Sequence, residues 1–138
     1  TLSLNYVGGD RPAGEILGRI SAGLKSLSHK QSLLAIREQV GEVCEVFRYS
    51  DRPNLGPILS KGWEAKKKLD NGVSSRQIEE AFALAQGSHL MGGKLLGAGG
   101  AGFLLLQHYR ADDLARIFCP DHIPFEFDNT GTTVLFRE

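Results

Sequence analysis

One short loop in the second half of the chain has the composition of a phosphate-binding segment. Six of the chain's 17 glycines lie between Gly92 and Gly102, and apolar residues flank the loop on both sides. Glycine takes positive φ angles without a steric penalty and lets another backbone approach closely. In the stretch Gly97-Ala98-Gly99-Gly100-Ala101-Gly102, successive N–H groups could form a nest for a phosphate, or the loop could support a second loop that does so. The alternative is a plain turn between two buried strands.

The glycines do not follow the two best-known nucleotide-binding patterns. Gly97, Gly99, Gly100 and Gly102 do not fit G-x-G-x-x-G, and no crossover helix with an acidic residue follows them. A P-loop would end in Lys-Ser or Lys-Thr, whereas Lys94 precedes this loop. The loop is therefore neither a dinucleotide fingerprint nor a P-loop.

A second candidate for anion binding lies near the start of the chain. Arg11 follows a glycine turn at the expected N-terminus of a helix, where free N–H groups and a guanidinium favour an anion. The alternative is a surface arginine that pairs with Asp10 or Glu15.

Composition limits the other kinds of function. The 138 residues are 41% apolar and 23% charged, as in a single soluble domain, and the formal net charge is zero. We therefore expect neither nucleic acid nor a membrane as a partner, and the lysine run 66–68 is expected to be a solvated helix face. Cys44 and Cys119 are expected to be buried thiols in a reducing, cytoplasmic compartment. The scattered histidines predict no metal site.

Apolar periodicity predicts four helices before the loop. Their stripes are Leu17, Ile20, Leu24 and Leu27; then Leu33, Ile36, Val40, Val43 and Phe47; then Leu55, Ile58, Leu59, Trp63 and Leu69; then Ile78, Ala81, Phe82 and Ala85. The first two helices are expected to pack as an antiparallel hairpin. The third runs from 53 to 69 with Trp63 in the core, and the fourth begins at Ser74 with Gln77 completing a capping box.

Strands are expected at both ends of the chain and beside the loop. Leu2, Leu4 and Tyr6 alternate with Ser3, Asn5 and Val7 in the periodicity of a half-buried strand. Further strands are expected at 93–96, 103–107, 123–127 and 132–136, with a helix at 112–118. The predicted order is β-αααα-ββ-α-ββ, which is an α+β fold with an antiparallel sheet and helices on one face. Since the chain opens directly on a strand, we expect residues 1–138 to be a fragment or a processed chain that begins where the second domain of a larger protein begins, with a separate subunit as the alternative.

Several segments resemble the GHMP kinases, and within that superfamily the bacterial heptose phosphate kinases. The segments are Gly93 to Phe103, which looks like the third motif of the superfamily; Trp63 with Lys66; Gly72-Val73-Ser74; and Gly131-Thr132. They occur in the family's order and span most of the chain. Ala101 departs from the family, which usually has glycine there, and Leu90-Met91 replaces the usual Gly-Ala.

The resemblance implies a ferredoxin-like C-terminal domain of an ATP-dependent sugar kinase that acts on a heptose phosphate. ATP and Mg²⁺ would then be bound mainly by an N-terminal domain, in the same or another polypeptide, and the catalytic residues would lie there. This domain would supply the loop Gly97 to Gly102, and Arg11 or Lys94 would face the sugar phosphate. For Lys94 the alternative is a solvated strand-edge lysine. The functional alternatives are another superfamily kinase, such as a fucokinase-like enzyme, and a non-catalytic module that binds a sugar phosphate, a partner or a second copy in a homodimer.

Overall fold

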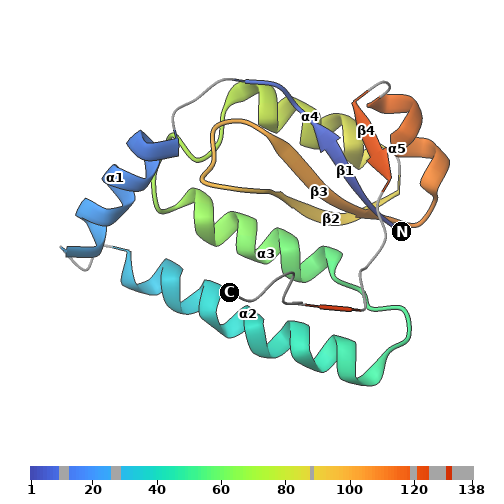
Figure 1. The fold of residues 1–138 in the computed structure, drawn as a ribbon, viewed down its shortest axis with the longest axis horizontal. Helices are drawn as coiled ribbons and strands as arrows, with labels where there is room; N and C mark the ends of the chain where they lie inside the picture. Colours follow the sequence, from blue (N-terminus) through green and yellow to red (C-terminus); the bar gives the residue numbers. More distant parts are fainter. Residues whose placement is uncertain (10–12, 26–28, 88, 119–120, 125–129, 132–138) are drawn as a thin grey trace, which may run out of the picture.

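The computed structural model describes residues 1–9, 13–25, 29–87, 89–118, 121–124 and 130–131. Within them the chain forms one strand, four helices, two strands, a helix and a strand (Figure 1). The elements are β1 (Leu2–Tyr6), α1 (Ala13–Lys25), α2 (Lys30–Tyr49), α3 (Gly56–Lys67), α4 (Arg76–Gln86), β2 (Leu90–Leu95), β3 (Phe103–His108), α5 (Ala111–Ile117) and β4 (His122–Pro124). The predicted α+β order is confirmed as far as β4. The strand predicted at 132–136 lies outside the described residues.

The four strands form one antiparallel sheet in the order β2-β3-β1-β4. β1 lies in the interior of the sheet, because Tyr6 pairs with Phe103 of β3 and Leu4 pairs with Ile123 of β4. The first strand of the chain is therefore held entirely by residues from its second half. β2 and β3 form a hairpin, and the glycine-rich loop is its connection.

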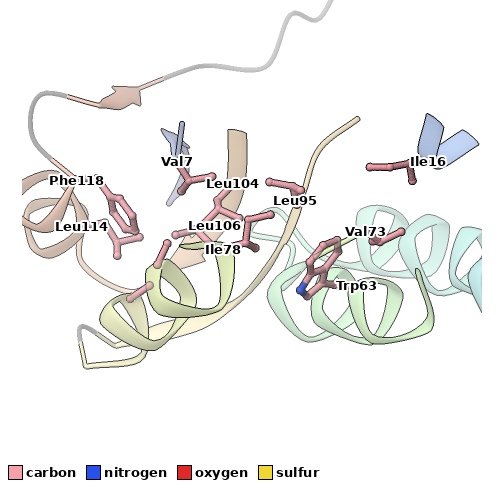
Figure 2. Close-up of a cluster of buried hydrophobic side chains, with 12 residues drawn as sticks. Val7, Ile16, Trp63, Val73, Ile78, Leu95, Leu104, Leu106, Leu114 and Phe118 are labelled. Atoms are coloured by element: carbon pink, nitrogen blue, oxygen red, sulfur yellow. The ribbon is translucent and has the colours of Figure 1, made fainter. Parts of the chain in front are cut away.

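The hydrophobic core lies between the sheet and the helices α4 and α5, and it extends to α3. Leu104 and Leu106 of β3 are fully buried, and Figure 2 shows Leu114 of α5 pointing toward this pair. Trp63 of α3 is only 3% exposed, and its ring stacks on Phe82 of α4 with centroids 6.0 Å apart. The prediction that Trp63 belongs to the core is confirmed.

Helix α3 covers the outer edge of β2 and lies between the sheet and α2 (Figure 1). The Ser60 hydroxyl accepts a hydrogen bond from the Gly93 N–H at 3.0 Å. Gly56 and Gly92 meet so closely that a Cβ on Gly92 would overlap the Gly56 carbonyl group. An open edge strand would expose unpaired N–H groups to other chains, so this contact protects the sheet.

The buried face of β1 carries Ser3, Asn5 and Val7, although alternation alone favours burial of the other, more apolar set. Ser3 and Asn5 are 1% and 0% exposed, whereas Tyr6 is 41% exposed. The polar groups are satisfied. The Asn5 side-chain amide donates from Nδ2 to the Ser3 hydroxyl at 3.0 Å, and Oδ1 of Asn5 lies 2.8 Å from Nδ1 of His122. Buried polar side chains are tolerated when they are paired in this way.

The helices α1 and α2 do not form the predicted antiparallel hairpin. α2 packs along α3 instead, and none of its residues is buried. Apolar side chains on the predicted stripes that stay exposed are Leu17, Leu24, Leu33, Val40 and Phe47. An amphipathic stripe shows that a helix has an apolar face, but it does not say which element covers that face. Among the described residues, no helix combines the length and apolar character needed to cross a bilayer.

The two cysteines have different outcomes. Cys44, which we predicted to be buried, lies exposed on α2, because α2 turns several of its apolar residues away from α3. Cys119 lies outside the described residues.

Candidate functional site

The glycine-rich loop lies at the end of the sheet nearest α1 (Figure 1). Gly97 is exposed, Gly99 is buried, and the rest of Ala98 to Gly102 is half-buried, so the loop is at the surface. Four glycines have positive φ angles, namely Gly97 (+73°), Gly99 (+125°), Gly100 (+80°) and Gly102 (+117°). An L-residue with a side chain rarely adopts these angles, so the glycine content follows from the path of the loop.

One side of the loop packs on the segment that leads into α4. The Gly100 N–H donates a hydrogen bond to the Val73 carbonyl at 2.8 Å. A Cβ on Gly99 would lie 2.7 Å from Cα of Val73 and 2.8 Å from its carbonyl oxygen, closer than real Cβ contacts come. Gly99 is therefore needed for close approach as well as for its φ angle.

The other side of the loop packs on the end of β1. The Gly102 N–H donates to the Gly8 carbonyl at 3.2 Å, and the Val7 N–H donates to the Gly102 carbonyl at 2.9 Å. A Cβ on Gly9 would lie 2.7 Å from Cβ of Ala101. The methyl group of Ala101, which departs from the family pattern, thus fits because the facing residue is glycine.

These contacts bear on what the loop can do chemically. Gly100 and Gly102 use their N–H groups on Val73 and Gly8 within the domain, so these two donors do not face a ligand. This favours the hypothesis that the loop supports another phosphate-binding segment over the hypothesis that it cradles the phosphate itself. A loop held on both sides offers a firm surface for such a segment.

Two lysines lie at the start of the loop. Lys66, near the end of α3, donates a hydrogen bond from Nζ to the Gly97 carbonyl. Lys94 is half-buried on β2, opposite Leu105 of β3. Partial burial, and secondly the charge of Lys94, hold the pKa of Lys66 below its ordinary value. The structure thus brings Lys94, a predicted site residue, together with Lys66 and the loop.

Lys66 is a site residue that reasoning from the residues alone missed. Within the run 66–68 it was expected to be solvated, but it is half-buried and bonded to the loop. The three adjacent lysines look alike in the sequence, and only the folded structure shows that Lys66 is half-buried while Lys68 is exposed. Two signals were available: Trp63 with Lys66 is one of the segments that resemble the GHMP kinases, and a side chain one helical turn after a core residue can lie beside the core.

The remaining predicted residue, Arg11, lies outside the described residues. A hollow of about 640 Å³ lies between α1 and the segment before α4. Arg19 makes a double hydrogen bond to Asp70 there, at 2.8 and 2.9 Å, which holds the pKa of Asp70 below its ordinary value. Ser75, rather than the predicted Ser74, caps α4 by accepting the Ile78 N–H at 3.4 Å.

Two curated relatives are sugar kinases. The L-fucokinase/L-fucose-1-P guanylyltransferase of Bacteroides fragilis is 31% identical over 105 residues, which is 75% of this chain and 11% of the relative. The D-glycero-alpha-D-manno-heptose 7-phosphate kinase of Campylobacter jejuni is 31% identical over 74 residues, which is 54% of this chain and 22% of the relative. The chain therefore spans less than a quarter of the length of each. No protein-family model matches the sequence.

Two solved structures share the fold. The L. major mevalonate kinase, crystallised with R-mevalonate, superposes on 87% of this chain with a TM-score of 0.72 and 17% identity. The Lin0012 protein from Listeria innocua covers 91% of this chain with a TM-score of 0.75 and 18% identity. This chain corresponds to 39% of each of those chains.

Proposed function

Because this chain belongs to the C-terminal domains of the GHMP kinase superfamily, we propose that it is the C-terminal lobe of an ATP-dependent sugar kinase. The reaction is transfer of the γ-phosphoryl group of ATP to a sugar hydroxyl, in a cleft between this lobe and a nucleotide-binding domain. A heptose phosphate is our first choice of acceptor, because a heptose 7-phosphate kinase is among the relatives. A cytoplasmic location remains a prediction.

The observation that carries the proposal is the support of the glycine-rich loop. Val73 and Gly8 hold the loop from two sides through backbone hydrogen bonds, while Gly97 remains exposed. Phosphoryl transfer depends on positioning and on electrostatic stabilisation far more than on covalent chemistry. A rigid surface that keeps a neighbouring ATP-binding loop in place is a contribution that a lobe without catalytic residues can make.

An apolar face of the sheet supports a second contact with the nucleotide-binding domain. Tyr6, Phe103 and Ile123 are 41%, 38% and 43% exposed. They lie on one face, since Tyr6 pairs with Phe103, and Leu4, two residues before Tyr6, pairs with Ile123. The rings of Tyr6 and Phe103 are in contact, with centroids 5.1 Å apart. Contiguous exposed apolar side chains of this kind mark interaction surfaces.

The cofactors are ATP and Mg²⁺, and we propose that the partner domain binds most of both. Within the described residues, no three side chains of the metal-ligating types lie together. On the resemblance to the GHMP kinases, we propose that the Mg²⁺ ligands and the catalytic residues lie in the partner domain. The candidate contacts of this lobe to a sugar phosphate are Lys94, at the loop, and Arg11.

A second candidate acceptor is fucose or a related free sugar. The match to the fucokinase covers 75% of this chain, against 54% for the heptose kinase. Of the two acceptors, only the heptose phosphate carries a phosphate group, so a cationic site on this lobe would favour it.

The proposal is tested by measuring ATP turnover with a coupled ADP assay. The 138-residue chain and the full-length gene product are each assayed with heptose 7-phosphate and with fucose. We expect acceptor-dependent turnover by the full-length product and none by the chain alone. Turnover by the isolated chain, or a full-length product that is inactive with both acceptors, would refute the proposal.

A further inference from the structure

Two cationic side chains from different elements converge on the exposed start of the glycine-rich loop. Lys66 reaches it from α3 and donates one hydrogen bond to the Gly97 carbonyl. Lys94 is half-buried on β2, three residues before Gly97, and its charge helps to lower the pKa of Lys66. An ammonium has three N–H donors, so Lys66 keeps two for another acceptor.

Neither lysine has a carboxylate partner among the described residues, whereas two other lysines of α3 do. Lys61, one and a half turns earlier on α3, pairs with Glu42. Lys67 pairs with Glu64 at 2.8 Å and with Glu79 at 3.4 Å. Lys68, just after the helix, also has no carboxylate partner among the described residues, but it is exposed, whereas Lys66 is half-buried and bonded to the loop.

The arrangement costs free energy as it stands. Lys66 is half-buried and is repelled by Lys94, and both effects lower its pKa. Two like charges held together out of water are stable only when another contact compensates, or when an anion joins them. A phosphate dianion would turn the repulsion into two charge-assisted hydrogen bonds.

We propose that Lys66 and Lys94 form a binding site for a phosphate group beside Gly97, at the exposed start of the loop. The inference rests on the proposed function for the source of that phosphate, which is either the acceptor sugar or ATP. Lys94 supplies charge from the sheet, and Lys66 both fixes the loop and contacts the phosphate. Placement on α3 and β2, rather than on the loop, makes the pair rigid.

The test uses ¹³C-lysine-labelled 138-residue chain and follows the Cε signals of Lys66 and Lys94 by NMR. Inorganic phosphate is titrated against chloride at matched ionic strength. We expect a dissociation constant of about 1–10 mM, as for a partial site, and a rise in the pKa of Lys66 on binding. Binding should weaken as pH falls through the second pKa of inorganic phosphate, where the dianion becomes a monoanion.

Three variants separate binding from loop support. K94M keeps the contact between Lys66 and Gly97, and it should weaken phosphate binding about tenfold. K66M removes that contact and should weaken phosphate binding to a similar extent. K68M is the matched control, because Lys68 is exposed at the end of the same helix, and it should bind as the parent does. Unmoved Lys66 and Lys94 signals, or equal binding by K94M and K68M, would overturn the proposal.

Two further ligands identify the source of the phosphate. A response to mannose 6-phosphate that exceeds the response to ATP assigns the acceptor's phosphate, and the reverse assigns the nucleotide; either supports the site. No response to either ligand or to inorganic phosphate overturns it. Because binding is read without turnover, its failure is distinct from a failure of the kinase assay.

Discussion

Replacement of Gly99 by alanine tests whether the glycine-rich loop is packed on the backbone of Val73. The new Cβ would lie 2.7 Å from Cα of Val73, and the φ angle of +125° is strained for any L-residue. The strain costs about 1–2 kcal/mol. Relief of the overlap requires the loop to move away, which breaks the hydrogen bond from Gly100 to Val73 and costs about 1 kcal/mol more. We expect a total loss of about 2–3 kcal/mol in the free energy of unfolding.

Gly102 provides a matched control. Its φ angle of +117° is similar, but a Cβ there meets nothing within 4 Å, so G102A should lose only the strain of about 1–2 kcal/mol. Both variants of the 138-residue chain are unfolded in urea and followed by the fluorescence of Trp63, the chain's one tryptophan, which is 3% exposed. If G99A is no less stable than G102A at equal m-values, the packing of the loop on Val73 is refuted.

Three more outcomes follow from other contacts. G9A should destabilise the chain through its contact with Ala101, and A101G should recover part of that loss in the double variant; additive losses would contradict the contact. The Gln107 side chain accepts a hydrogen bond from the Gly56 N–H at the start of α3 and donates one to the Pro53 carbonyl at 2.8 Å. Q107L removes both, so urea unfolding should show a loss of about 1–3 kcal/mol in the free energy of unfolding. Arg19 lowers the pKa of Asp70; the pair's stabilisation is therefore present above about pH 4 and is lost as pH falls through the lowered pKa. The unfolding midpoint should fall more steeply below pH 4 for the parent than for D70N, and parallel pH profiles would argue against the pair.

Periodicity and turn chemistry were sufficient to predict the order of elements as far as β4, since each depends on neighbouring residues. The stripe through Trp63 identified a helix and its buried face, and Gly97 to Gly102 identified a tight connection. Tertiary contacts were harder to predict. α2 carries the same kind of stripe as α3, yet its Val40 is 64% exposed, because the choice of covering element is a non-local property. On β1, a hydrogen bond to His122, 117 residues away, decides that Asn5 is buried.

In the candidate site, too, local features were predictable and non-local ones were not. The loop was predictable because its glycines are adjacent in the sequence. Lys66 was not, because its role comes from proximity to Gly97 and Lys94, which α3 and β2 bring together only in the folded chain. The reason for glycine at position 99 was half predictable: positive φ is a local expectation, whereas the close approach of Val73 is not.

Acceptor-dependent ATP turnover by the full-length gene product and by a variant of it tests the central claim most directly. The variant is G97A, since a Cβ at Gly97 meets nothing within 4 Å in this lobe and Gly97 is the exposed residue of the loop. If the loop supports a neighbouring ATP-binding segment, G97A should lose at least tenfold in kcat/KM for ATP. Its free energy of unfolding should stay within about 1–2 kcal/mol of the parent's, which is the strain of one positive-φ residue. Unchanged kcat/KM in G97A would contradict a loop that a second domain rests on.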